Sequence, residues 1–126
     1  MKTIYSEHAP KAIGPYCHAL QSGNLIFCSG QTPLNPETMT IEGINITEQT
    51  TVVLNNLESV LKAAGCNRNH IIKTSVFLKN FADFEKMNKA YEAFFGDHKP
   101  ARTTVEVSRL PKEALVEIEC VAELPG

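Results

Sequence analysis

The spacing of apolar residues along the chain predicts two helices. The first follows Asn45, whose side chain can accept from free backbone amides, with Glu48 three residues later as in a capping box. Its apolar positions recur with a helical period before Gly65, and they are Val53, Leu57, Val60, Leu61 and Ala64. The second helix is expected to be capped by Asp83 and to stop at Gly96. Its apolar side consists of Phe84, Met87, Tyr91, Phe94 and Phe95, which we interpret as core residues.

Alternating and β-branched segments predict six strands, at about residues 3–5, 16–22, 25–29, 71–78, 102–107 and 116–122. Residues 22–24 suit a hairpin turn, and residues 31–43, with two prolines, suit a loop. The predicted order is three strands, a helix, a strand, a helix and two strands. Right-handed crossovers then place both helices on one face of a mixed sheet, which makes an α+β two-layer sandwich.

The sheet face that the helices leave open is predicted to carry ions among apolar residues. Strand alternation puts Arg102 and Thr104 on one side of their strand, and Glu117 opposite the buried side of the last strand. We expect these three residues to share the open face. That face is either solvated, as is usual for antiparallel sheets, or covered by another subunit with a polar pocket at the boundary.

The length of the chain indicates one domain, and its net charge disfavours nucleic-acid binding. The chain has 126 residues, which suits a single domain over residues 1–126. It carries 12 Lys and Arg against 14 Asp and Glu, for a formal net charge of −2. There is no basic excess to neutralise phosphates, so a nucleic acid is not expected as its primary partner.

The chain is expected to be cytoplasmic and not to interact with membranes. No apolar run approaches the roughly 18 residues that span a bilayer, and the first residues do not have the pattern of an export signal. The four cysteines (Cys17, Cys28, Cys66 and Cys120) contain no C-x-x-C pair, and free thiols are therefore expected.

The sequence lacks zinc-site, nucleotide-binding and serine-hydrolase motifs. The four histidines lie at residues 8, 18, 70 and 98 without zinc-ligand spacing, so no metal is expected. The glycines form neither a dinucleotide-binding motif nor a P-loop, and no serine lies in G-x-S-x-G. Among the remaining polar residues Arg102 has two interpretations. It is either a surface ion-pair partner or a planar fork that binds the carboxylate of a substrate.

Several motifs together resemble the RidA/YjgF family over essentially the whole chain. They are Ala12-Ile13-Gly14-Pro15-Tyr16, Ser29-Gly30-Gln31, Asn88 followed by Tyr91-Glu92-Ala93-Phe94-Phe95, Pro100-Ala101-Arg102-Thr103-Thr104-Val105-Glu106-Val107, Arg109-Leu110-Pro111 and Val116-Glu117-Ile118-Glu119. The resemblance implies a homotrimer of chorismate-mutase-like subunits with pockets at the subunit interfaces. It also implies hydrolysis of 2-enamine and 2-imine acids, such as 2-aminoacrylate and 2-iminopropanoate, to 2-keto acids and ammonia, without metal or organic cofactor. An enzyme of this kind is a 2-iminobutanoate/2-iminopropanoate deaminase.

The resemblance also assigns roles to residues of this chain. Arg102 would bind the substrate carboxylate, Glu117 would orient or deprotonate a water molecule, and Tyr16 would line the pocket and donate a hydrogen bond. The remaining substrate-binding residues would be Ser29, Gly30, Asn88 and Thr104. Many relatives carry cysteine where this chain has Thr104, so thiol chemistry is not expected at that position.

Two other functions fit the same features. The pocket could bind a small carboxylate and regulate a partner protein without catalysis, which also requires Arg102. Some members of the family have been described as ribonucleases or translation inhibitors, although the net charge of −2 argues against RNA as a ligand.

Overall fold

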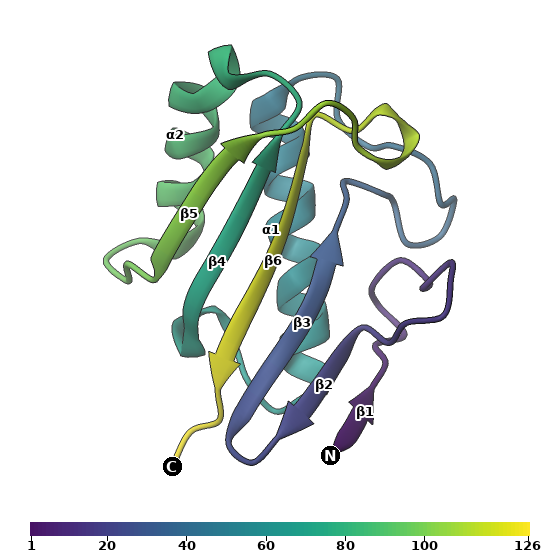
Figure 1. Ribbon diagram of the computed structural model, residues 1–126, viewed down its shortest axis with the longest axis vertical. Coiled ribbons are helices and arrows are strands. Elements are labelled where there is room, and N and C mark those ends of the chain that lie inside the picture. Colours follow the sequence, from purple (N-terminus) through teal and green to yellow (C-terminus); the bar gives the residue numbers. More distant parts are fainter.

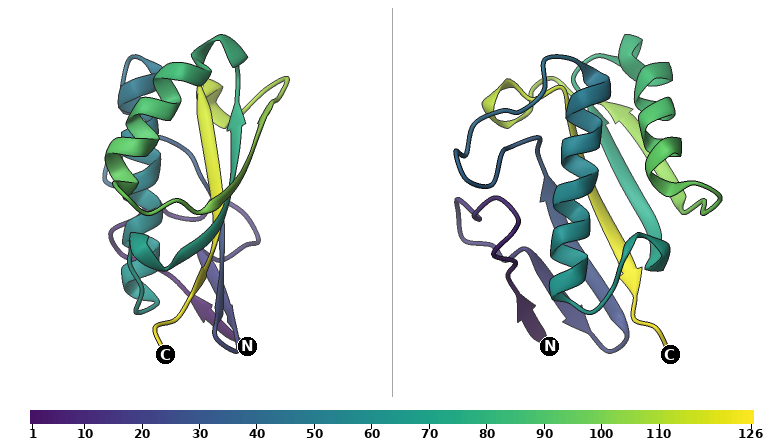
Figure 2. Two further views of the ribbon diagram at one scale, coloured as in Figure 1. Left: turned by 90° about the vertical axis from the view of Figure 1, so that its left-hand side faces the viewer. Right: turned by 180° about the vertical axis from the view of Figure 1, so that it is seen from behind.

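The protein forms a six-stranded mixed sheet with two α-helices on one face (Figures 1 and 2). The computed structural model describes residues 1–126. The strands are β1 (Lys2–Ile4), β2 (Ala19–Ser22), β3 (Leu25–Gln31), β4 (Ile71–Leu78), β5 (Ala101–Glu106) and β6 (Val116–Glu123), and the helices are α1 (Ile46–Ala63) and α2 (Phe84–Phe95). The predicted element order and the two-layer α+β class are confirmed.

The sheet places its last strand in the middle. Its strand order is β1-β2-β3-β6-β4-β5, and only β4 and β5 run parallel to each other. β6 pairs antiparallel with β3 on one side and with β4 on the other. Helices α1 and α2 connect β3 to β4 and β4 to β5 on the same side, which Figure 2 shows edge-on and from behind.

Helix α1 begins and ends as the sequence predicts. The Asn45 side chain accepts from the amide of Glu48 at 2.9 Å. The Glu48 carboxylate accepts from the amide of Ile44 at 3.1 Å, one residue earlier than in a standard capping box. Gly65 follows the helix with φ +87°, a conformation that glycine adopts without a steric cost.

Helix α2 has the predicted bounds but a different start. Asp83 occupies the position before the helix, yet its side chain makes no capping hydrogen bond. The cap lies one turn earlier, where Asn80 accepts from the amide of Ala82 at 2.9 Å and begins a 3₁₀ turn at Phe81–Asp83. The prediction that the Asp83 side chain caps this helix is therefore wrong, whereas Gly96 ends it with φ +63°.

The hydrophobic core lies between the helices and the sheet. Fully buried side chains include Leu57 of α1, Met87 of α2, Ile26 of β3, Val76 of β4 and Ile118 of β6. The opposite sheet face keeps apolar side chains exposed, with 46% of Phe27 and 40% of Val105 accessible. Neither helix combines the length and the apolar character that a membrane crossing requires.

The ends of β2 and β3 differ from the prediction. β2 begins at Ala19 rather than at residue 16, because the chain turns sharply beforehand and the amide of Tyr16 donates to the carbonyl of Gly14 at 2.9 Å. β3 continues beyond the predicted end at residue 29 and reaches Gln31. Both differences lie beside a polar cleft of the chain.

Candidate functional site

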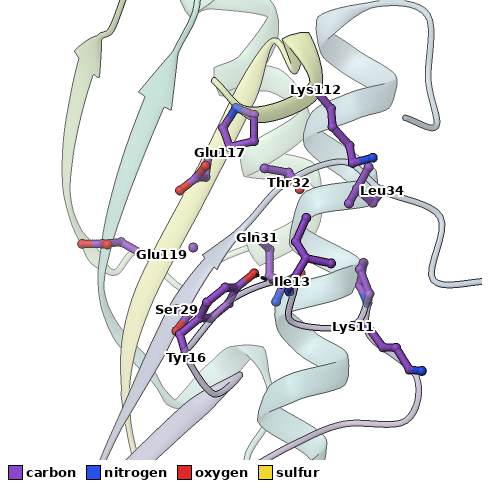
Figure 3. Close-up of a pocket in the computed structure, with 13 residues that line it drawn as sticks. Lys11, Ile13, Tyr16, Ser29, Gln31, Thr32, Leu34, Lys112, Glu117 and Glu119 are labelled. Atoms are coloured by element: carbon purple, nitrogen blue, oxygen red, sulfur yellow. Dashed lines mark hydrogen bonds between the residues drawn. The ribbon is translucent and has the colours of Figure 1, made fainter. Parts of the chain in front are cut away.

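A cleft of about 600 Å³ opens where the loop before β2, the end of β3 and the start of β6 meet (Figure 3). Tyr16, Ser29, Gly30 and Glu117 line it, so the structure brings together four of the residues that the sequence selects. In Figure 3, Tyr16 and Glu117 reach the cleft from different segments, the loop before β2 and strand β6. The cleft is therefore built by the sheet rather than by a single loop.

A β-bulge shapes the floor of this cleft. Cys28 pairs with Cys120 and Gln31 pairs with Ile118, so two residues of β3, Ser29 and Gly30, oppose one residue of β6. The Ser29 hydroxyl donates to the carbonyl of residue 17 at 2.7 Å and fixes the bulge to the loop before β2. Bulges of this kind redirect side chains and occur often beside active sites.

The Glu117 carboxylate lies directly against Gly30. A Cβ atom at Gly30 would collide with Glu117 Oε2 and would lie 3.0 Å from Glu117 Cδ. Glycine is thus required here by space and not by its φ angle. Its missing side chain lets the carboxylate approach the backbone of the bulge.

Glu117 is a half-buried carboxylate without an ion pair. The only ion pair of the chain joins Arg68 to Glu58 of helix α1, and neither residue lines the cleft. Burial, and to a smaller extent the nearby charge of Glu119, raises the pKa of Glu117 above its usual value. A carboxyl group of raised pKa in a cleft is suited to proton transfer, so Glu117 is the candidate acid–base group.

Tyr16 lines the cleft beside Ser29 of the bulge (Figure 3). Its hydroxyl oxygen accepts a long hydrogen bond of 3.4 Å from the amide of Ile13, drawn as a dashed line in Figure 3. The tyrosine side chain is 44% exposed, and its hydroxyl hydrogen is free to donate to a ligand.

Arg102 and Thr104 do not lie on the face predicted for them. In the parallel register of β4 and β5, Arg102 is beside Thr74 and Thr104 is beside Val76, and both β4 residues are buried under the helices. Arg102 and Thr104 therefore share the helix-covered face, whereas Glu117 lies on the open face. The prediction that these three residues share one face is wrong, since it is the valine side of this edge strand that faces outward.

Two aromatic rings of α2 hold the Arg102 guanidinium. Its Cζ atom lies 4.8 Å from the ring centroid of Tyr91 and 5.7 Å from that of Phe84. Arg102 belongs to no ion pair, so its five N–H donors are available to a ligand. The aromatic stripe of α2 was expected to serve only the core; its contact with Arg102 was not predicted.

A second cavity, of about 350 Å³, lies beside Arg102. Asn88, Tyr91, Lys99 and Arg102 line it, between α2 and the start of β5. Asn88 Oδ1 and Thr104 Oγ1 are buried without any hydrogen-bond partner. A third unpaired buried oxygen, Thr50 Oγ1 of α1, does not line this cavity, so a missing partner does not by itself identify a ligand site.

The sequence-selected residues thus form two separate groups in one chain. Tyr16, Ser29, Gly30 and Glu117 surround the cleft on the open side, and the other group, Arg102, Thr104 and Asn88, lies on the helix side. Two cleft residues, Lys11 and Lys112, were not identified from the sequence. Lys112 follows Pro111 of a quoted motif, but its positive φ of 55° could not be predicted from that motif.

Comparisons with known proteins agree on one family. A family model described as endoribonuclease L-PSP matches residues 6–124. A RutC family protein of Pyrococcus horikoshii is 50% identical over 121 residues, which cover 96% of each chain. The chain belongs to the RidA/YjgF family.

Two further members of the family have more specific descriptions. The 2-iminobutanoate/2-iminopropanoate deaminase of Escherichia coli is 45% identical over 124 residues, covering 96% of each chain. The crystal structure of Escherichia coli TdcF with bound serine is 38% identical, with a TM-score of 0.94 and coverage of 99% of this chain and 100% of that one. The resemblance to the RidA/YjgF family in the sequence, and the fold it implied, are confirmed.

Proposed function

We propose that this RidA/YjgF protein is a cytoplasmic 2-imino acid deaminase, with one domain in each chain. The observation that carries the proposal is the Glu117 carboxylate, half-buried, unpaired and held over the bulge at Gly30. The name of the Escherichia coli relative supports the reaction, and the serine bound to TdcF supports a ligand with an amino-acid skeleton.

The proposed reaction is hydrolysis of a C=N bond without metal or organic cofactor. Arg102 binds the substrate carboxylate through two parallel hydrogen bonds and fixes the imine carbon relative to a water molecule. Glu117 takes a proton from that water as its oxygen bonds to the imine carbon. That proton passes to the imine nitrogen to give a carbinolamine. The hydroxyl proton of the carbinolamine then moves to the amine nitrogen as the C–N bond breaks, and a 2-keto acid and ammonia leave.

The remaining residues shape the substrate position in this proposal. Tyr16 donates a hydrogen bond from the cleft wall, and the backbone of Ser29 and Gly30 supports the carboxylate of Glu117. Asn88 and Thr104, whose oxygens lack partners in the single chain, serve the substrate beside Arg102. The raised pKa of Glu117 places its proton affinity closer to neutral pH, where a general base is most effective.

In this proposal, the location of Arg102 favours a site shared between two copies of the chain. Arg102 and Glu117 lie on opposite faces of the sheet, and β4 separates their strands. A complete site therefore combines the Glu117 cleft of one copy with the Arg102 cavity of another. This arrangement supports the homotrimer that the resemblance implies, with pockets between neighbouring subunits.

A coupled assay tests the reaction. A pyridoxal-phosphate-dependent serine dehydratase generates 2-aminoacrylate, semicarbazide competes for its imine, and release of the keto acid is followed with and without the protein. We expect acceleration by the wild type and its loss in Arg102→Ala and Glu117→Gln. Lys86→Ala on the exposed side of α2 and Glu123→Gln at the end of β6 are matched controls that keep activity.

Subunit complementation tests the shared site. Arg102→Ala and Glu117→Gln chains are produced together, so that about a quarter of the sites in random trimers regain both residues. Recovered activity supports a site built from two copies, and a particle mass of three times 13.9 kDa supports the trimer. Equal inactivity of mixed and separate variants contradicts the two-copy site.

The description of the family model favours a second candidate, an RNA-cleaving enzyme. The net charge of −2 provides little attraction for phosphates. If RNA is bound with an affinity that falls steeply with salt and is also cleaved, and the imine assay stays negative, the ribonuclease function replaces the deaminase. Binding of small carboxylates without turnover leads instead to the regulatory function.

A further inference from the structure

We infer that the cavity beside Arg102 selects substrates with a second acidic group, the 2-imino dicarboxylic acids, and that Lys99 is the residue that recognises this group. The inference rests on the proposed deaminase function and concerns its substrate class. Its basis is that two cationic side chains, Lys99 and Arg102, line one cavity of about 350 Å³.

Neither cation is neutralised within the chain. Arg102 and Lys99 have no carboxylate within ion-pairing distance, since Arg68 and Glu58 form the only ion pair. Arg102 is held by ring faces, which leaves its hydrogen-bond donors unused. The one acidic residue that lines this cavity is Glu92, an exposed side chain on α2.

The two cations suit different parts of one ligand. The flat guanidinium of Arg102 matches the α-carboxylate, and the ammonium of Lys99 acts as a mobile point charge for a more distant acidic group. Like charges that line one small cavity repel each other, and a ligand with two negative charges relieves this repulsion. A substrate with an apolar side chain offers no partner to the Lys99 ammonium, so this lysine does not add to its affinity.

The histidine of this cavity has a structural role. His98 Nε2 donates to the carbonyl of Ile71 at 2.7 Å, which fixes the segment between α2 and β5 to the start of β4. This bond anchors the backbone immediately before Lys99. The lysine is therefore presented from a fixed segment, although its own side chain is exposed.

The other lysines near the site are in different surroundings. Lys11 and Lys112 line the cleft on the open face, where Glu117 and Glu119 supply two carboxylates. The charges in that cleft balance, whereas those in the Arg102 cavity do not. This difference favours Lys99 over Lys112 as the residue for a distal acid.

The test compares two imines in the same assay. An aspartate oxidase generates 2-iminosuccinate and an alanine-specific amino-acid oxidase generates 2-iminopropanoate, with catalase to remove peroxide and semicarbazide as competitor. Wild type is compared with Lys99→Ala, with Lys112→Ala, and with Lys89→Ala on α2 as a matched control. We expect Lys99→Ala to lower kcat/KM for 2-iminosuccinate about fivefold, the upper range for an exposed ion pair, and to leave 2-iminopropanoate unchanged.

Binding of unreactive acids gives a second readout. Calorimetry with succinate and with butanoate at fixed ionic strength is expected to show the same selective loss of succinate affinity in Lys99→Ala. Equal loss for both acids, no loss for either, or a selective loss in Lys112→Ala instead overturns the role of Lys99. If neither imine is hydrolysed by the wild type, the proposed function fails first, and the succinate titration still decides whether Lys99 binds a second acidic group.

Discussion

Substitution of Gly30 by alanine would move the Glu117 carboxylate without removing it, and so tests whether its position matters for activity. Ordinary contact with a Cβ begins near 3.4 Å, whereas the Cβ introduced at position 30 would lie 3.0 Å from Glu117 Cδ and closer still to Oε2. The carboxylate must therefore retreat by about 1 Å, a displacement that can reduce catalysis by about a hundredfold.

The cost to folding should be much smaller. The colliding atoms are the end of a flexible side chain, so rotation of Glu117 away from Gly30 costs on the order of 1 kcal/mol. Gly30→Ala is thus expected to fold, with a melting temperature a few degrees lower, and to lose most of its deaminase activity.

A double-mutant cycle measures the contact directly. In a Glu117→Ala background the collision is gone, and Gly30→Ala should be neutral or slightly stabilising because alanine restricts the unfolded chain. Urea unfolding of the four proteins gives the coupling free energy. The same destabilisation by Gly30→Ala in both backgrounds would refute the steric reasoning, and full activity of Gly30→Ala would refute the requirement for this carboxylate position.

Three further predictions concern charge and packing. Burial raises the pKa of Glu117, so its contribution to stability is present at acid pH and is lost as the pH rises through the raised pKa. Relative to wild type, Glu117→Gln should therefore be more stabilised at pH 7 than at pH 4, as measured by urea unfolding. Arg68→Ala removes two hydrogen bonds to Glu58 and should cost about 1–2 kcal/mol in the same measurement. Tyr91→Phe keeps the ring below Arg102 and should keep kcat/KM, whereas Tyr91→Leu removes the ring and should lower it.

Each of these predictions has a control variant or a second measurement. Glu119→Gln removes the smaller influence on the pKa of Glu117 and should change the pH dependence less than Glu117→Gln does. Lys62→Ala, which removes a cation near the end of α1, should cost less than Arg68→Ala. Tyr91→Phe should still lose stability, because it leaves the buried Thr74 hydroxyl without its 2.7 Å partner, so stability and activity separate in this variant.

The helices and the central strands could be predicted because their patterns have one physical cause. The apolar stripe of α1 and the alternation of Val116, Ile118, Cys120 and Ala122 both bury one side against a single core. Burial of these residues leaves only one arrangement that satisfies the pattern. The handedness of crossovers then places both helices on one face of the sheet, but it does not predict the central position of β6.

The face of Arg102 could not be predicted by the same reasoning. β5 is an edge strand with exposed positions on both sides, so its alternation shows which residues share a face and not which face is covered. Val105 lies outward although it is the more apolar residue, because pairing with β4 and the rings of α2 determine where Arg102 lies. Ring contacts between distant segments have no signal in local spacing.

The β-bulge at Ser29 and Gly30 could not be predicted from the local sequence pattern either. Ser29 was expected to end a strand and Gly30 to follow it, so the sequence offered no reason to expect both residues inside one strand. The extra residue is defined by β6, which pairs with β3 from almost the other end of the chain. The floor of the cleft is therefore set by a long-range register.

The central position of β6 has a consequence for the order in which the protein can form. The strand that joins the two halves of the sheet is the last one synthesised, and its register with β3 links Leu25 to Glu123. Contacts of such high sequence separation slow folding, because the entropy of closing a long loop is lost before the contacts between its ends can stabilise the chain. A nascent chain that stops before residue 116 lacks the strand that joins β3 to β4, and it also lacks Glu117. The proposed catalytic group is therefore synthesised together with the strand that completes the sheet.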